Sequence, residues 1–479
     1  MNEQSDTPRS NGTEHDSVSS LSDSVRRMTR SARARRLRRS PMISTRLWVR
    51  RMVFWGGAVA VSLTAIAFAK LADRAQDVFS VVIAHGAWII LILAPAGLVV
   101  SFLLARHVFP GSQGSGIPQV IASLDLADVR QVDRILSLRI AVGKILLTLL
   151  GLASGASIGR EGPTVQVGAS VMHALGRLLH LPTPELRRSV VLAGGAAGIA
   201  AAFNTPLAGI VFAIEELSHS YEARTSGNTL AAVVISGVVT IALVGNYSYF
   251  GHIDATMKFG PSEVMAMVIC ALLGGLLGGS FSALLIRAAK GFPGALGRLV
   301  KQYPVLFAAL CGLIVAITGL LSHGETYGTG YEQARDMVTG IPGDTEGLKF
   351  ALLKLVASAA SYLSGIPGGI FAPSLAIGAG LGEWVAWLVP GLAAGSVVLL
   401  GMVAYFSGVV QAPITAAVIV MEMADNQSML IPLMATSMMA FAVSRLVCRR
   451  ALYGALARRF AMTIPVPSPV RETVQEEGK

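Results

Sequence analysis

The segment Gly159-Arg160-Glu161-Gly162-Pro163 sets two charged side chains between glycines, directly before an apolar stretch of chain. Proline is tolerated in the first turn of a helix, because its missing N–H has no partner to lose there, so a helix is expected to begin at this segment. The start of a helix leaves backbone N–H groups free and carries a partial positive charge. Such a helix start is one element from which an anion site can be built, and several pointing at one place would be needed to form it.

The composition indicates that most of the chain lies outside water. The 479 residues are 53% hydrophobic and only 14% charged, and the mean hydropathy is +0.61. Soluble proteins carry about 25% charged residues. The 51 glycines are typical of membrane helices, in which small residues let backbones approach closely. We therefore predict an all-α polytopic membrane protein.

Apolar stretches of two kinds follow one another along the chain. A membrane-spanning helix needs about 20 apolar residues, and stretches of this kind lie near 47–70, 82–106, 139–155, 228–246, 260–287, 304–321 and 426–445. Others are short or interrupted by glycine, proline or charge, at 163–178, 188–216, 347–362, 370–388 and 395–422. Non-helical backbone at membrane depth has to be buried in protein or line an aqueous cavity. The interrupted stretches are therefore the expected place of a transport pathway.

The interrupted segments occur twice, in the same order. The pattern of glycine, proline and glycine in 159–168 returns in 369–378, at an offset of 210 residues. The proline and glutamate of 206–215 return in 413–422, at an offset of 207 residues. Two matches at nearly one offset predict a repeated unit. The spacing does not decide between parallel and inverted repeats, but inverted repeats would bring each pair together near the membrane midplane.

Two further segments share the features of 159–163. They are Gly114-Ser-Gly-Ile-Pro118 and Gly369-Ile-Phe-Ala-Pro373, and in each a glycine or proline stands where a helix would begin. Several helix starts pointing at one place make an anion site without a full positive charge. Such a site suits a pore, where binding must be weak enough for release. The alternative for any one segment is a simple turn between packed membrane helices.

These three segments, in this order, resemble the anion-pathway signatures of the CLC family of chloride channels and chloride/proton antiporters, and the resemblance covers residues 45 to 462. It implies a CLC-type inverted repeat of tilted and re-entrant helices, in a homodimer whose subunits each hold a pore. The domain organisation that follows is a disordered Arg-rich tail at 1–45, a transmembrane domain at 46–462 and a short tail at 463–479. Within the transmembrane domain we expect repeats at 46–250 and 251–446 and a pore-lining helix near 448–460.

The resemblance also implies the anion ligands. The hydroxyl of Ser115, the backbone N–H groups of Ile370 and Phe371, and the hydroxyl of Tyr453 would surround a central anion. Serine and tyrosine at these two positions favour chloride over nitrate and fluoride within the family. Lys144 matches a family position that adds positive potential, although a lysine that snorkels to the interface is an equal alternative. Residues expected beside the pathway are Gly114, Gly116, Lys144, Gly159, Arg160, Gly162 and Gly369.

Glu161 would be the gating glutamate, which occupies an anion position when ionised and swings away when protonated. A carboxylate among helix starts competes with anions for the same positive field, and charged groups within membrane segments mark functional positions. The alternative is a salt bridge to the adjacent Arg160.

Glu216 follows Glu161 by 55 residues, the spacing at which antiporters of the family keep a proton-transfer glutamate. It would pass protons from the cytoplasm toward Glu161, which favours antiport. The alternative for Glu215 and Glu216 is a helix end that meets water.

Other functions remain open at this point. The nearest is a passive, voltage- or pH-gated chloride channel of the same family. More distant ones are an unrelated secondary transporter and an intramembrane enzyme, for which no catalytic residues are found. The three cysteines, Cys270, Cys311 and Cys448, form no metal or disulfide pattern. We expect no cofactor and no metal, with chloride, protons, the lipid bilayer and a second copy of the chain as partners.

The charge distribution orients the chain. Residues 1–51 hold twelve arginines and no lysine, and more arginines cluster around 445–459. Cationic flanks of spanning helices stay in the cytoplasm, so both termini are expected there, in the inner (plasma) membrane. Binding of the tail to nucleic acid is the less favoured alternative. Only 26 residues follow Tyr453, too few for the nucleotide-binding domain pair of many eukaryotic relatives.

Overall fold

The computed structural model describes residues 45–126, 128–180, 183–218, 223–245, 248–251, 257, 259–341 and 343–463. Apart from Thr45 and Thr463, the two tails expected at 1–45 and 463–479 lie outside the described residues. The chain divides into two units, 1–53 and 54–479. Of the first unit, the structure describes only the beginning of helix α2, and all that follows concerns the second.

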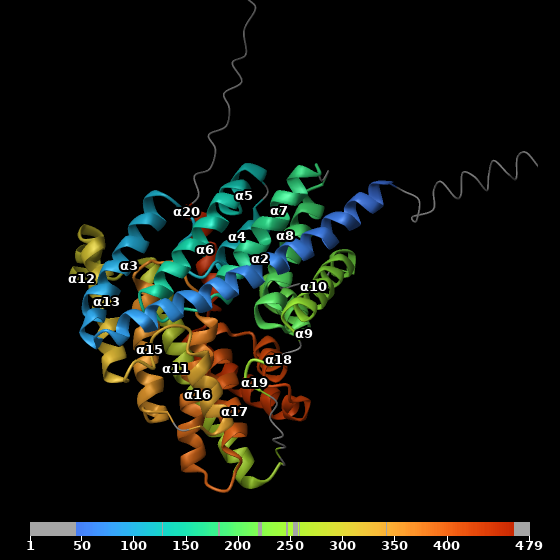
Figure 1. Cartoon of the computed structure of the whole chain (residues 1–479). Coiled ribbons are helices and arrows are strands. Elements are labelled where there is room, and N and C mark those ends of the chain that lie inside the picture. The colour runs from blue at the N-terminus through green and yellow to red at the C-terminus, as the bar shows by residue number, and fades with distance from the viewer. Residues whose placement is uncertain are drawn as a thin grey trace, which may run out of the picture. The chain divides into compact units, whose positions relative to one another are not determined.

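The described residues are helical and contain no strand, which confirms the all-α class. Short 3₁₀ or π turns cover Ala87–Ile89, Ala213–Ser218 (η2) and Gln427–Met429. The α-helices, drawn in Figure 1, are α2 (Thr45–Ala84), α3 (Ile90–His107), α4 (Ile117–Asp125), α5 (Val129–Ile135), α6 (Leu138–Ala153), α7 (Glu161–Leu178), α8 (Pro184–Phe203), α9 (Pro206–Phe212), α10 (Ala223–Val244), α11 (Pro261–Lys290), α12 (Gly294–Gln302), α13 (Pro304–Leu321), α14 (Tyr331–Thr339), α15 (Gly347–Leu363), α16 (Phe371–Leu388), α17 (Ala394–Val410), α18 (Pro413–Met423), α19 (Leu430–Val447) and α20 (Leu452–Thr463).

Among the described residues, eight helical segments are long and apolar enough to cross a membrane. They are Arg51–Ala84, Ala87–His107, Val129–Ala153, Pro184–Phe203, Gly227–Val244, Pro261–Lys290, Pro304–Leu321 and Gln427–Val447. Each predicted span falls on one of these segments. The predicted boundary near 70–82 was wrong, because α2 continues to Ala84 and the next helix starts only after a turn at residues 85–86.

Two of the interrupted stretches are broken where predicted. The first breaks at Asn204, which takes a left-handed conformation with φ 55°, and α9 then begins at Pro206. The second breaks at Gln411, with φ 61°, and α18 then begins at Pro413. Proline suits the first helical turn, so each break ends one helix and starts another. The stretches at 163–178, 347–362 and 370–388 are instead unbroken helices, namely α7, α15 and α16.

At equivalent positions in the two halves of the chain, a glycine lets two neighbouring helices pack closely. A Cβ atom on Gly168 of α7 would lie 2.4 Å from the carbonyl oxygen of Gly194 of α8. A Cβ atom on Gly378 of α16 would lie 2.6 Å from the carbonyl oxygen of Gly401 of α17. Side chains at these positions would separate the backbones, so small residues are required. Because Gly168 and Gly378 are equivalent in the predicted repeat, the two halves pack in the same way.

A glutamate from each half of the chain also caps a helix of the other half. Glu215 accepts hydrogen bonds from the backbone N–H groups of Ile414 and Thr415, at 3.2 and 2.6 Å, where α18 begins. Glu422 accepts hydrogen bonds from the N–H groups of residues 207 and 208, at 3.1 and 2.6 Å, where α9 begins. Each carboxylate therefore satisfies free donors at the helix start of the other half. Glu215 therefore caps a helix of the other half, and the alternative of a helix end that meets water is wrong for this residue.

Candidate anion pathway

Hydrogen bonds bring the three predicted segments together. The N–H of Gly114 donates to the carbonyl of Ile366, and the N–H of Gly368 donates to the carbonyl of Gly114, both at 3.2 Å. Gly159 and Gly369 exchange two hydrogen bonds, each of 2.7 Å. The starts of α4, α7 and α16 are thus joined through backbone atoms, although they lie far apart in the sequence.

The pairing of Gly159 with Gly369 is antiparallel. In an antiparallel pair, each residue donates its N–H to the carbonyl of the other. When the two residues are equivalent in a repeat, this exchange places a local twofold axis between them. The reciprocal caps at Glu215 and Glu422 have the same relationship. The two halves are therefore inverted relative to one another at this place.

The side chains of Ser115 and Tyr453 meet in the protein interior. Their side chains are neighbours, and both are almost wholly buried, with 1% and 0% exposed. Neither hydroxyl oxygen has a hydrogen-bond partner among the described residues. Buried hydroxyl groups normally have partners, so two neighbouring ones without any point to a site for an acceptor such as an anion.

The start of α16 lies beside Tyr453. Ile370 precedes the helix and Phe371 is its first residue, so their backbone N–H groups belong to the free end of the helix. The buried ring of Phe371 lies 6.0 Å from the ring of Tyr453 and 4.8 Å from that of Phe406. This packing fixes the helix start beside Tyr453, which α20 carries.

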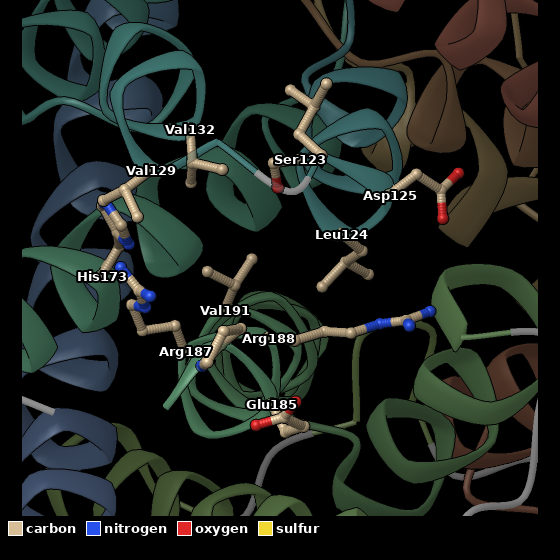
Figure 2. Close-up of a pocket in the computed structure, with 12 residues that line it drawn as sticks. Ser123, Leu124, Asp125, Val129, Val132, His173, Glu185, Arg187, Arg188 and Val191 are labelled. Atoms are coloured by element: carbon tan, nitrogen blue, oxygen red, sulfur yellow. The ribbon is translucent and has the colours of Figure 1, made fainter. Parts of the chain in front are cut away.

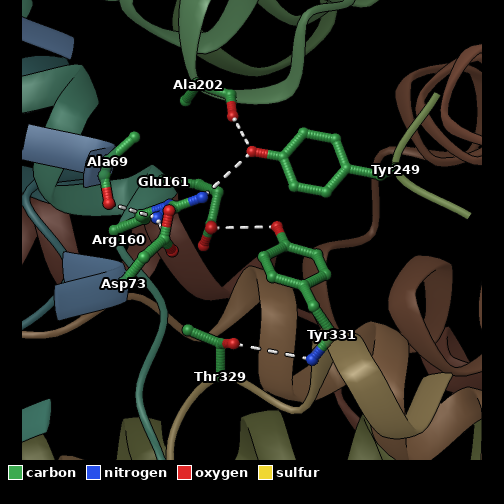
Figure 3. Close-up of polar contacts among 8 residues, drawn as sticks. All are labelled: Ala69, Asp73, Arg160, Glu161, Ala202, Tyr249, Thr329 and Tyr331. Atoms are coloured by element: carbon green, nitrogen blue, oxygen red, sulfur yellow. Dashed lines mark hydrogen bonds and ion pairs between the residues drawn. The ribbon is translucent and has the colours of Figure 1, made fainter. Parts of the chain in front are cut away.

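Glu161 is the first residue of α7 and is fully buried. Its Oε1 atom accepts a hydrogen bond of 2.9 Å from the hydroxyl of Tyr331 (Figure 3). Its Oε2 atom has no hydrogen-bond partner, and the carboxylate lies within electrostatic range of the backbone N–H of Ala372 in α16. The carboxylate therefore lies at the N-terminal ends of both α7 and α16, which carry partial positive charge.

Arg160 forms its ion pair with Asp73 and not with Glu161 in the described residues, so the alternative of a salt bridge between neighbours is wrong. Its guanidinium donates to the carboxylate of Asp73 at 2.5 Å and to the hydroxyl of Tyr249 at 3.2 Å (Figure 3). A third hydrogen bond, of 2.6 Å, reaches the carbonyl of Ala69. Arg160 adds positive charge near the carboxylate without forming an ion pair with it.

Glu216 lies on the π-helical turn η2 and is 2% exposed, with no hydrogen-bond partner for Oε1. Turns of this type are rare and frequently mark functional positions. The carboxylate is within electrostatic range of Tyr453. The structure thus excludes a helix end in water for Glu216 and brings its buried carboxylate near Tyr453.

Lys144 does not snorkel to an interface, because its side chain is fully buried. The ammonium donates to the carbonyls of Gln113 and Gly114, at 3.3 and 2.9 Å. Gly114 and Gly116 have positive φ angles of 67° and 99°, which glycine adopts without strain. Lys144 therefore fixes the loop that presents Ser115.

A second loop of this kind was missed from the sequence. Gly328 and Gly330 also have positive φ angles, 63° and 84°, directly before α14. The buried ammonium of Lys354 donates to the carbonyls of residues 326–328, at 2.9, 3.3 and 2.9 Å. Lys354 follows Lys144 at the offset of 210 residues already found for the repeat, and this was the signal that would have identified the loop.

A separate pocket of about 240 Å³ lies at the far end of α4. Figure 2 shows Asp125, His173, Arg187 and Arg188 around it. His173 pairs with Asp133 at 2.7 Å. None of the predicted site residues lines this pocket, so the candidate pathway and the pocket are distinct.

A family model described as voltage gated chloride channel matches residues 96–445. The chain belongs to the CLC family. It is accordingly a membrane protein, and the apolar helices of the structure are its membrane part.

Curated CLC proteins are similar over most of their length. The H(+)/Cl(-) exchange transporter ClcA of Yersinia pestis (strain Angola) is 31% identical over 450 residues, covering 88% of this chain and 91% of that protein. ClcA of Vibrio vulnificus (strain YJ016) is 31% identical over 384 residues, covering 78% of this chain and 80% of that protein.

Solved CLC structures show the same fold. A slow cyanobacterial Cl-/H+ antiporter matches with a TM-score of 0.75 and 23% identity, over 87% of this chain and 98% of that chain. A eukaryotic CLC transporter matches with a TM-score of 0.71 and 20% identity, over 86% of this chain and 74% of that chain. The predicted CLC-type fold is confirmed.

Proposed function

We propose that the protein exchanges chloride for protons across a membrane. One observation carries the proposal: a buried carboxylate and two unpartnered buried hydroxyls lie where three helix starts meet. Such a place attracts an anion and holds a group that can carry a proton. The names of the curated relatives, H(+)/Cl(-) exchange transporters, support the same pair of substrates.

Chloride binds between the hydroxyls of Ser115 and Tyr453 and the N–H groups of Ile370 and Phe371. The neutral donors hold the ion through dipoles. Lys144 supports the site indirectly, through the loop of Gly114 and Gly116. The binding is therefore weak enough for the ion to leave, as transport requires.

Glu161 is the gate in this proposal. When ionised, its carboxylate takes the place of an anion at the starts of α7 and α16. A proton removes the charge and with it the attraction to these helix ends, so the side chain leaves and chloride passes.

Glu216 receives protons from the cytoplasmic side in this proposal. Its burial and its position near Tyr453 support a proton route that joins the anion route at the central site.

The test is transport by the purified full chain in proteoliposomes under a chloride gradient. Glu216→Gln is compared with wild type and with Glu185→Gln, which alters an exposed glutamate at the start of α8. We expect uphill proton movement in wild type and in the control, and chloride flux without proton movement in Glu216→Gln. Chloride flux without proton movement in wild type would leave a passive channel, and the absence of chloride flux would refute the substrate.

We further propose a homodimer that covers the face around α9 and α18. Leu207 and Ile414 are exposed there, at 46% and 41%, beside the half-buried carboxylates of Glu215 and Glu422. Carboxylates facing lipid would be costly, whereas a second copy of the chain would shield them. The mass of the detergent-solubilised protein should be twice 50.0 kDa, and Ile414→Trp should favour the monomer.

We also propose that both termini lie in the cytoplasm, at the inner membrane; the arginines before the first span and after the last support this orientation. Protease accessibility of terminal tags in oriented vesicles tests this placement.

A further inference from the structure

The hydroxyl of Tyr331 makes the single hydrogen bond from another side chain to Glu161 in the described residues, at 2.9 Å from Oε1 (Figure 3). The two residues are 170 positions apart in the sequence. Tyr331 is the first residue of α14, a helix of the second half, whereas Glu161 begins α7 in the first half. The contact therefore reaches the candidate gate from the opposite half of the chain.

The backbone that carries Tyr331 is held firmly. Lys354 binds the three carbonyls of residues 326–328, and the hydroxyl of Thr329 accepts the N–H of Tyr331 at 3.5 Å. A Cβ atom on Gly330 would lie 2.7 Å from Ala376 of α16. This tight packing leaves the loop little freedom, so the position of the tyrosine is set before any ion arrives.

The ring of Tyr331 is held as well. Its centroid lies 5.0 Å from that of Tyr249 and 6.3 Å from that of Phe250. Tyr249 in turn donates to the carbonyl of Ala202 at 2.9 Å and accepts from Arg160. The hydroxyl is thus directed at the carboxylate by the packing of its ring against two other aromatic rings, as an arrangement for a specific contact requires.

We propose that Tyr331 is a positioning residue for Glu161: its hydroxyl holds the ionised carboxylate in the anion pathway and thereby sets the pH at which the pathway opens. The inference rests on the proposed gating role of Glu161. A hydrogen bond to an ionised acceptor is stronger than one to a neutral acceptor. The tyrosine therefore stabilises the closed, ionised state more than the open, protonated one.

Other groups face the same carboxylate. Arg160 is a nearby cation, but Asp73 and Tyr249 bind its guanidinium. Ala372 presents a backbone N–H from α16, and Tyr453 of α20 lies within electrostatic range. Tyr331 differs from these groups because its side chain donates a hydrogen bond to the carboxylate, and Tyr331→Phe removes that bond while the ring packing stays.

The experiment measures chloride efflux from proteoliposomes across the acid to neutral range. Tyr331→Phe removes the hydroxyl, so the ionised carboxylate loses stabilisation and becomes protonated at a lower proton concentration. We expect the midpoint of acid activation to move toward higher pH by about one pH unit, because losing a hydrogen bond to its charged form shifts the pKa of a carboxyl group by about that amount.

Tyr327→Phe is the matched control. It removes another buried tyrosine hydroxyl of the same loop, which donates to the carbonyl of Ala316 at 3.1 Å and does not contact Glu161. Its midpoint should equal that of wild type. A midpoint unchanged in Tyr331→Phe, or shifted equally in both variants, would overturn the inference.

A double variant separates the inference from the proposed function. In a Glu161→Gln background, which should lack pH dependence, adding Tyr331→Phe should change nothing. If Glu161→Gln is independent of pH and Tyr331→Phe has no effect on its own, only the role of Tyr331 fails. If Glu161→Gln keeps the full acid activation, the gate is elsewhere and both proposals fail.

Discussion

A Cβ atom on Gly162 would lie 2.4 Å from the hydroxyl oxygen of Ser115 and 2.9 Å from its carbonyl oxygen. Gly162 is the second residue of α7, and Ser115 lies just before α4. The same Cβ atom would be 3.3 Å from the Cα atom of Gly369. The absence of a side chain at this one position therefore lets the three helix starts meet around Ser115.

Gly162→Ala tests this arrangement. The added methyl group has to displace Ser115 or separate α7 from the neighbouring segments, so the central site loses its geometry. A loss on the order of 1–2 kcal/mol corresponds to about tenfold weaker chloride binding, measurable by titration calorimetry. Gly56→Ala is the control, because its Cβ atom would meet no atom within 4 Å. Equal affinities in both variants would show that the site lies elsewhere.

The two unpartnered hydroxyls make a second prediction. Ser115→Ala and Tyr453→Phe each remove one donor while keeping the volume of the side chain nearly unchanged. A neutral hydrogen bond contributes about 1 kcal/mol, so each variant should bind chloride roughly fivefold more weakly. Tyr405→Phe is the control: this tyrosine is also buried without a hydroxyl partner, but it packs against Phe281. Calorimetry that finds the three variants alike would contradict the placement of the anion.

The helix starts of the pathway could be predicted from the sequence because their signals are local. Glycine and proline stand at the positions where α4, α7 and α16 begin. The offset of 210 residues predicted that 159–168 and 369–378 are equivalent, and the hydrogen bonds between Gly159 and Gly369 agree with that. The sequence could not show whether the repeat is inverted, because parallel and inverted repeats share the same sequence pattern. The three-dimensional structure was needed to decide it.

The contacts made by side chains could not be predicted. Residues 323–346 offered no motif, and yet α14 within them brings Tyr331 to Glu161. Two neighbours in sequence, Arg160 and Glu161, find partners far away rather than each other. Such choices depend on which distant helices pack alongside, and hydropathy carries no information about that.

Glu161→Gln should abolish both proton coupling and pH dependence. In the proposed mechanism the ionised carboxylate competes with chloride, and as the pH falls it becomes protonated and leaves, so chloride flux is expected to rise with acidity. Glutamine resembles the protonated form at every pH. Flux through the variant should therefore be high at neutral pH and flat across the range, with no uphill proton transport. Stopped-flow or electrode records of chloride efflux at several pH values measure this, and a variant that still responds to acid would remove Glu161 from the gate.

Glu215→Gln and Glu422→Gln should destabilise the protein by similar amounts. Each substitution replaces a carboxylate that accepts two backbone N–H bonds at a helix start with a neutral amide. Charge-assisted capping of this kind contributes about 1–2 kcal/mol, so the midpoint of thermal unfolding in detergent should fall by a few degrees in each variant. Glu185→Gln, at an exposed position in the first turn of α8, should leave it almost unchanged. A large effect of Glu215→Gln alone would mean that the second half of the chain depends on the first but not the reverse, and a large effect of Glu422→Gln alone would mean the opposite.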